Sequence, residues 1–233
     1  MKVFNEFGVK PTRTHTAAGY DFYIPNIKTS VEESEFILEA FSKSYKKSVD
    51  ELKQIIDDLV LQVSAVYGED KVAGQEMNIL LLYLALDSYD VRHADDPVET
   101  FVDCKLIFDA NGTPGIRPIV FDHMFINSGI HTLLNPDTAG IFFNKSGKGV
   151  KGWDVRACVV DEDYAGFVHL SLSYTKLNDE DGIIYCGDKL IQMVVLNVAD
   201  KTDAEEINKE EYEKAMSNSE RGSAGFGSSD IKH

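Results

Sequence analysis

The stretch Val159-Val160-Asp161-Glu162-Asp163-Tyr164-Ala165-Gly166-Phe167-Val168 contains an acidic turn between two apolar runs, which extend over residues 155–160 and 167–173. Short apolar runs separated by Asp and Gly are typical of β-strands joined by tight turns. In a continuous strand Asp161 and Asp163 would point to the same face, because side chains alternate with a period of two. A turn that begins near Glu162 would instead separate their roles. Without Tyr164 and Gly166 the pattern would favour a purely structural acidic turn.

The same pattern of short runs and turn residues extends in both directions from this stretch. Upstream, Asp109-Ala110-Asn111-Gly112 carries the Asn-Gly signal of a hairpin between residues 102–108 and 116–121. Further apolar runs occupy residues 141–143, 183–185 and 189–198. Many short strands with Gly and Asp turns are typical of an antiparallel β sandwich or jelly roll. We therefore predict a mainly β fold for this part of the chain.

Residues 28–100 carry helical patterns instead. Ser48 followed by Glu51 predicts a capping box, after which apolar residues recur at helical spacing. A second helix is expected to start at Ser30. A third helix, at about residues 70–89, is apolar nearly all round, which predicts burial among the other helices or against a partner.

These changes of pattern divide the chain into three parts. Residues 1–27 and 101–200 are expected to form the β domain, and residues 28–100 a helical insertion within it. Residues 201–233 begin with a charged, helix-compatible segment that has Asp203 near its start. We expect this last part to be a linker helix followed by a flexible C-terminal arm.

The composition is that of an ordinary globular protein, and it excludes several functions. Of the 233 residues, 43% are hydrophobic and 27% are charged, and the formal net charge is −16. This acidity argues against a nucleic acid polymer as partner, because affinity for a phosphate backbone comes mainly from Lys and Arg. No membrane association is expected, since no apolar run approaches the roughly 18 residues needed to span a bilayer. Three cysteines without close pairing favour a cytoplasmic location, in the host cytoplasm if the protein is viral.

An acidic protein can still bind a nucleoside triphosphate if it concentrates positive charge locally. Residues that could supply such charge are Lys145, Lys148, Lys151, Arg156, Lys189 and Arg221. The last of these opens the run Arg221-Gly222-Ser223-Ala224-Gly225-Phe226-Gly227-Ser228-Ser229. Its glycines let backbone N–H groups approach an anion closely, Arg221 offers a planar fork to phosphate, and Phe226 offers an aromatic face to a base. The same composition is typical of a disordered tail.

Five segments resemble, in the same order, the motifs of the trimeric dUTP pyrophosphatases, the dUTPases. They are Ala18-Gly19-Tyr20-Asp21-Phe22, Lys145-Ser146-Gly147, Val160-Asp161-Glu162-Asp163-Tyr164-Ala165-Gly166, Gly187-Asp188-Lys189-Leu190-Ile191-Gln192 and the C-terminal run just quoted. The resemblance covers residues 11–27, 119–198 and 221–229, and it leaves the helical middle outside. It implies a dUTPase-like antiparallel β jelly roll or barrel with an inserted α-helical subdomain, α+β overall.

The resemblance implies an enzyme, a dUTP diphosphatase that hydrolyses dUTP to dUMP and pyrophosphate. Asp161 would be the general base that orients and deprotonates the attacking water. The ring of Tyr164 would pack under the deoxyribose and leave no room for a 2′-hydroxyl. Val160 ends the segment of residues 153–160 whose backbone would bind the uracil. The resemblance also implies a homotrimer with shared active sites.

The remaining site residues follow from the same resemblance. Phosphate contacts would come from Lys145, Ser146, Gly147 and Gln192. The arm would close over the substrate through Arg221, Phe226, Gly227 and Ser228. Asp188 is expected to brace its motif through hydrogen bonds. Mg²⁺ is the expected cofactor, bound through phosphates and water without a direct protein ligand, and Asp21 would either touch it through water or be a structural carboxylate.

The sequence departs from the family pattern at several positions, and two other interpretations stay open. Lys145 replaces the usual Arg and keeps the charge without the bidentate fork, and Cys158 replaces a small Gly. The dCTP deaminases share the fold but place a catalytic Glu on the strand at residues 167–172, where this chain has His169 and Ser171. A regulatory or interaction protein on a dUTPase scaffold would use residues 28–100 to bind a protein partner.

Overall fold

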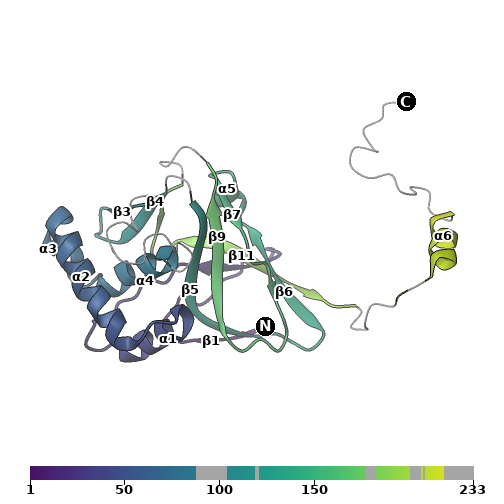
Figure 1. Ribbon diagram of the computed structural model, residues 1–233, viewed down its shortest axis with the longest axis horizontal. Helices are drawn as coiled ribbons and strands as arrows, with labels where there is room; N and C mark the ends of the chain where they lie inside the picture. The colour runs from purple at the N-terminus through teal and green to yellow at the C-terminus, as the bar shows by residue number, and fades with distance from the viewer. Residues whose placement is uncertain (88–103, 119–120, 177–181, 200–205, 207, 218–233) are drawn as a thin grey trace. The chain divides into compact units, whose positions relative to one another are not determined.

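The structure is a computed structural model that describes residues 1–87, 104–118, 121–176, 182–199, 206 and 208–217. It has two compact units, Met1–Val198 and Ala199–His233. The first contains the sheets, and the second contains one described helix (Figure 1). The predicted arm, with Arg221, Phe226, Gly227 and Ser228, lies outside the described residues.

Two four-stranded sheets form the body of the first unit (Figure 1). The first sheet has the order β1-β5-β9-β7, from β1 (Lys2–Asn5), β5 (Phe121–Leu133), β9 (Phe167–Tyr174) and β7 (Trp153–Val155). The second has the order β2-β11-β6-β8, from β2 (Tyr20–Tyr23), β11 (Lys189–Asn197), β6 (Thr138–Asn144) and β8 (Val159–Val160). A smaller sheet has the order β10-β4-β3, from β10 (Ile184–Tyr185), β4 (Pro114–Pro118) and β3 (Cys104–Phe108). The paired strands of the described segments run antiparallel, which confirms the predicted mainly β fold.

Alternation of side chains explains why these strands pack with one face inward. Met193 of β11 and Phe142 of β6 are paired in register and both are buried. Phe22 of β2 meets Phe142 edge-on, with ring centroids 5.2 Å apart. Leu170 of β9 and Met124 of β5 are buried in the same continuous core. The inner faces of the two large sheets therefore share one hydrophobic core.

The long strand β5 is absent from the sequence-based predictions, which place a strand only as far as residue 121. Met124, Ile126, Ser128 and Ile130 are all buried, but Asn127 is buried as well, and the pairing with β9 is irregular between Asn127 and His131. Asn127 and Ser128 interrupt the apolar residues, so the pattern of period two is weak in hydrophobicity alone. The short edge strand β1 is also missing from those predictions.

The predicted Asn-Gly hairpin is confirmed by the pairing of β3 with β4. Gly112 has φ of +77°, a conformation that glycine adopts at little cost. The carboxylate of Asp109 accepts hydrogen bonds from the backbone N–H groups of Asn111 and Thr113, each at 2.8 Å. Local side-chain chemistry therefore closes this turn.

The helix predicted from Ser48 is confirmed as α2 (Val49–Tyr67), with both hydrogen bonds of the capping box present. The predicted start of the preceding helix at Ser30 is wrong, because α1 (Glu35–Tyr45) begins after Ser34. Ser34 Oγ donates to the carbonyl of Val31 at 2.7 Å, and the side chain makes no cap bond. An additional turn therefore precedes the helix.

The predicted third helix is two helices, α3 (Glu69–Val72) and α4 (Glu76–Asp87). Gly74, with φ of +75°, lies in the break between them. From Ile79 to Leu86 every side chain of α4 is buried against the rest of the chain. Asn78 joins α4 to the segment after β2, because its Oδ1 accepts from Ile27 N at 2.7 Å and its Nδ2 donates to Ile27 O at 2.9 Å. The apolar helix is thus covered internally.

Helix α6 (Lys209–Ser217) belongs to the second unit and begins later than predicted. Its cap is Asn208, and Asp203, the predicted cap, lies outside the described residues. Glu211 N donates to Asn208 Oδ1 and Asn208 N donates to Glu211 Oε2, both at 3.0 Å. None of the helices that the structure describes has the length and apolar character needed to cross a membrane.

Candidate functional site

Three strands of the second sheet place site residues side by side. Asp21 of β2 is directly opposite Gln192 of β11, and Gln192 is directly opposite Phe143 of β6. Directly paired residues share a face of the sheet. This face is the outer one, because the alternate residues Met193 and Phe142 point into the core.

At the end of β6 the chain turns into the short helix α5 (Ser146–Gly149), and a cavity of about 290 Å³ opens there. Its lining consists of Lys145, Ser146, Gly147, Lys148, Lys151 and Lys189. Four ammonium groups around one cavity create a strong local positive potential in an otherwise acidic protein. A Cβ atom at Gly147 would meet no heavy atom within 4 Å, so the glycine leaves this wall open. The cavity can hold a polyanion.

Asp21 orients two of these lysines. Its carboxylate forms ion pairs with Lys145 Nζ and with Lys189 Nζ, the latter at 3.1 Å. Burial alone would raise the pKa of Asp21, but the hydrogen bonds and positive charges of the two lysines hold the pKa below its usual range. The carboxylate is therefore ionised at neutral pH and positions both ammonium groups.

Asp188 plays a corresponding part for a third lysine. Its Oδ2 accepts from Lys148 Nζ at 3.0 Å and from the backbone N–H of Tyr185 at 3.3 Å. Its backbone carbonyl accepts from Ile24 N at 3.0 Å, and Gly187 N donates to Ile24 O at 2.9 Å. With φ of +92°, Gly187 makes the turn that allows this pairing. Asp188 thus links the start of β11 to the cavity.

Asn144, which the sequence-based site does not include, also supports the cavity. Its Oδ1 accepts from Val155 N and its Nδ2 donates to Asp154 Oδ1, both at 2.9 Å. Its backbone carbonyl accepts from Gln192 Nε2 at 3.1 Å. The sequence signal was a polar residue at the end of an apolar run, immediately before Lys145. Asn144 fixes the start of the lysine-bearing turn.

The second group of predicted site residues lies at the turn between β8 and β9. Tyr164 N donates to Asp161 O at 3.2 Å, which confirms the turn predicted near Glu162 and ends the strand before Asp163. Tyr164 OH donates to Phe167 O at 2.8 Å. A Cβ atom at Gly166 would lie 2.5 Å from that hydroxyl oxygen, so glycine is required for this ring position.

The turn presents its functional groups to solvent. Asp161 and Asp163 are exposed, and the side chain of Tyr164 is 42% exposed. Val160, which precedes them, is buried. Partial burial raises the pKa of Tyr164, so its hydroxyl stays protonated at neutral pH. The turn can therefore offer a carboxylate and a ring face to a ligand that comes from outside the chain.

The two groups do not form one site within the chain. Val160 pairs with Gly140 near one end of β6, whereas Lys145 directly follows the other end. At about 3.3 Å per residue along the strand, the two groups lie roughly 17 Å apart. We name them the acidic end (Asp161 and Tyr164) and the lysine end (the cavity with Asp21 and Gln192). Arg156, another predicted source of charge, does not line the cavity and donates from Nε to Ser173 Oγ at 2.7 Å.

The outer face of the second sheet between these two ends is apolar and open to solvent. Phe143 is 46% exposed, Val159 is 64% exposed and Leu196 is 48% exposed. Ile141 and Val194 are paired on the same face and are partly exposed. Exposed apolar side chains that gather in one patch are typical of an interaction surface.

The residues at the lysine end do not fit a metal ion bound directly by the protein. Among the described residues there is no group of three His, Cys, Asp or Glu side chains that could hold one. Both oxygens of Asp21 are already paired with lysine ammonium groups. A cation at this end would have to be held by the oxygens of a bound anion.

The lysine-lined cavity and the separate exposed carboxylate lie on one antiparallel β scaffold. The dUTPase family model matches residues 116–230. This match assigns residues 116–230 to the dUTPase family. A search of curated proteins found no match.

Solved structures of dUTPases resemble the fold at low sequence identity. A single-residue variant of the Staphylococcus bacteriophage 80alpha dUTPase with dUpNHpp has 12% identity and a TM-score of 0.46, and the match covers 98% of this chain and 96% of that chain. A variant dUTPase from phage phi11 of S. aureus, described with a structural Mg(II) ion, has 10% identity and a TM-score of 0.42, with 89% and 96% covered. The native EIAV dUTPase has 17% identity and a TM-score of 0.34, with 45% and 92% covered.

Proposed function

We propose that the protein is a dUTP diphosphatase that hydrolyses dUTP to dUMP and pyrophosphate. The observation that carries this proposal is the lysine end, where Asp21 and Gln192 share the outer sheet face and four lysines surround one cavity. A triphosphate has the charge density that such a cavity attracts. Family membership directs the choice to dUTP.

The complete site would form between copies of the chain. The lysine end and the acidic end lie at opposite ends of an exposed apolar face, so a second copy that covers this face can bring its acidic end to the first copy's lysine end. Such a contact joins two different patches, and a head-to-tail contact of this kind forms a ring when the rotation between copies closes. The resemblance to the trimeric dUTPases supports a ring of three copies.

In the assembled site the residues divide the chemistry between them. Asp161 would accept a proton from water as the water oxygen bonds to phosphorus and the bond between the α- and β-phosphates breaks. Lys145, Lys148 and Lys189 would offset the charge that develops on the departing pyrophosphate. The ring of Tyr164 would lie against the deoxyribose and exclude a 2′-hydroxyl by size. Mg²⁺ bound to the triphosphate would shield its oxygens from one another.

The first test is pyrophosphate release from dUTP, dCTP, UTP and dTTP with Mg²⁺. Asp161→Asn should abolish release from dUTP, while Asp163→Asn, two residues away on the same exposed turn, should retain most of it. Release from dUTP alone would support the proposal. No release from any nucleotide by folded wild-type protein, or an active Asp161→Asn variant, would contradict it.

A further inference from the structure

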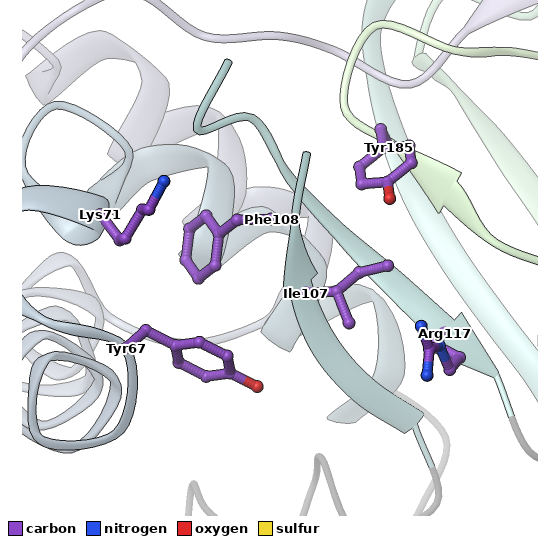
Figure 2. Close-up of a pocket in the computed structure, with 6 residues that line it drawn as sticks. All are labelled: Tyr67, Lys71, Ile107, Phe108, Arg117 and Tyr185. Carbon is purple, nitrogen blue, oxygen red and sulfur yellow. The ribbon is translucent and has the colours of Figure 1, made fainter. Parts of the chain in front are cut away.

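A second cavity, of about 360 Å³, lies where α2 and α3 meet the small sheet, and it shares no lining residue with the lysine end. Its lining consists of Tyr67, Lys71, Ile107, Phe108, Arg117 and Tyr185. Figure 2 shows Tyr67, Lys71 and Phe108 on one side of β3 and Ile107, Arg117 and Tyr185 on the other. We call it the hairpin cavity. The predicted site residues do not include any of them.

Two cations give the hairpin cavity its charge. Lys71 and Arg117 lie at opposite ends of the group of side chains (Figure 2). Arg117 Nε is buried and, within the part of the chain that the structure describes, has no hydrogen-bond partner. A buried guanidinium N–H without an acceptor is unfavourable, because it has lost water and gained nothing in return. A bound anion would supply the missing acceptor.

Aromatic side chains form the walls between the two cations, and their positions are fixed. Tyr67 OH donates to Leu106 O, and the Tyr67 ring lies edge-on to Phe108 with centroids 5.2 Å apart. Tyr185 lies over Gly115, where an added Cβ would come within 2.5 Å of the ring. Rigid aromatic faces suit the stacking of a flat ring.

We propose that the hairpin cavity binds a small planar aromatic anion of the nucleoside monophosphate class. The guanidinium fork of Arg117 matches phosphate geometry, and Lys71 adds charge at the other end. A volume of about 360 Å³ is close to the lower limit for small-molecule sites, which suits one base with one phosphate rather than a dinucleotide. The net charge of −16 argues against a nucleic acid chain as the ligand.

The probe is AMP, because its purine ring and 2′-hydroxyl do not suit the proposed dUTP site. Calorimetric titration of the full-length protein at low salt should give saturable binding of one AMP per chain. Arg117→Gln and Lys71→Gln should each weaken binding by about tenfold or more, since each removes a charge that contacts the anion. Lys148→Gln, which removes a lysine of the other cavity, should leave AMP binding unchanged. Circular dichroism and thermal unfolding verify that each variant is folded.

Adenosine and inorganic phosphate separate the two parts of the ligand. Each should bind at least about tenfold more weakly than AMP if the ring and the anion are recognised together. Three results would overturn the proposal: no saturable AMP binding, equal binding of phosphate or adenosine, or AMP binding that Lys148→Gln weakens and Arg117→Gln does not. Because the readout is binding of AMP, it is independent of whether the chain hydrolyses dUTP.

Discussion

The lysine end and the acidic end of the second sheet differ in how much of their geometry the chain itself provides. At the lysine end, Asp21 and Asp188 hold three lysines through ion pairs within the chain. At the acidic end, Asp161 is exposed on a turn, and the side chain of Tyr164 is held by a hydrogen bond from its hydroxyl to Phe167 O. Under the proposed function, the phosphate-binding groups would be positioned within one chain, whereas the reaction would depend on a second chain.

Mixed trimers give the largest expected effect and the most direct test of this difference. Asp161→Asn and Lys145→Gln should each reduce dUTP hydrolysis to about 1% or less when present in every chain. Trimers that carry both variants, isolated by two affinity tags after co-expression, should regain about a third of wild-type activity, because one of the three head-to-tail contacts then joins an intact acidic end to an intact lysine end. The measurement is pyrophosphate release per chain. Mixed trimers as inactive as the parents would place both ends of the site in one chain.

Leu196→Asp should separate the two ends by opening the apolar face. A carboxylate buried at an interface without a partner costs several kcal/mol, about 2–4 per chain, so trimers should dissociate at micromolar concentration and activity should fall by about tenfold or more. Light scattering during size-exclusion chromatography measures the mass. Leu61→Asp is the matched control, because Leu61 is 73% exposed on α2 and away from this face. Unchanged mass in the Leu196 variant would show that the face is free.

Asp21→Asn tests how strongly the lysine end is prepared within the chain. Loss of the charged hydrogen bonds should lower the free energy of unfolding at pH 7 by about 1–2 kcal/mol and raise KM for dUTP severalfold. The pKa of Asp21 is lower in the folded state than in the unfolded state, so its contribution is present above the unfolded pKa and is lost as pH falls through the folded pKa. Urea unfolding between pH 7 and pH 3 should therefore show a smaller loss of stability in the variant. If the stability of the two proteins depended on pH in the same way, the ion pairs of Asp21 would not contribute to stability as expected.

Tyr164→Phe should have the smallest effect. It removes only the hydroxyl bond to Phe167 O, about 1 kcal/mol or less at a partly exposed turn, and keeps the ring that would exclude UTP. Tyr164→Ala removes the ring as well and should increase hydrolysis of UTP relative to dUTP. Comparison of kcat/KM for the two nucleotides separates these contributions. Selectivity that is lost equally in both variants would assign discrimination to the hydroxyl.

Local chemistry could be predicted from the sequence, whereas long-range pairing could not. The capping box at Ser48 and the Asn111-Gly112 turn depend on neighbours within a few residues, and both were predicted correctly. The pairing of Val160 with Gly140, which separates the acidic end from the lysine end, joins residues far apart in the sequence. The order of short motifs along the chain does not determine which residues of two strands pair with each other.

The hairpin cavity illustrates the same limit. Lys71, Arg117 and Tyr185 come from three distant segments, and each alone looks like an ordinary surface or strand residue. The third helix was predicted as one segment because its apolar residues hide the break at Gly74. The strand β5 was missed because its inward positions include Ser128. The hydroxyl of Ser128 donates a hydrogen bond to Val168 O, which allows this polar side chain to be buried in the core. A polar side chain can be buried when it has a hydrogen-bond partner, and here the partner is far away in the sequence, so the local pattern does not reveal it.

Because α1, α2 and α4 share one core with the sheets, the helical insertion cannot be removed as a cassette. Tyr45 at the end of α1 donates to Phe125 O at 3.0 Å and accepts from Asn127 N at 2.9 Å, so the helix is bonded to the middle strand of the body. Loss of α4 would expose to water the apolar interior that it shares with the sheets. The insertion is therefore an integral part of the fold. Exchange of this segment between relatives would succeed only when the strands that face it are exchanged as well.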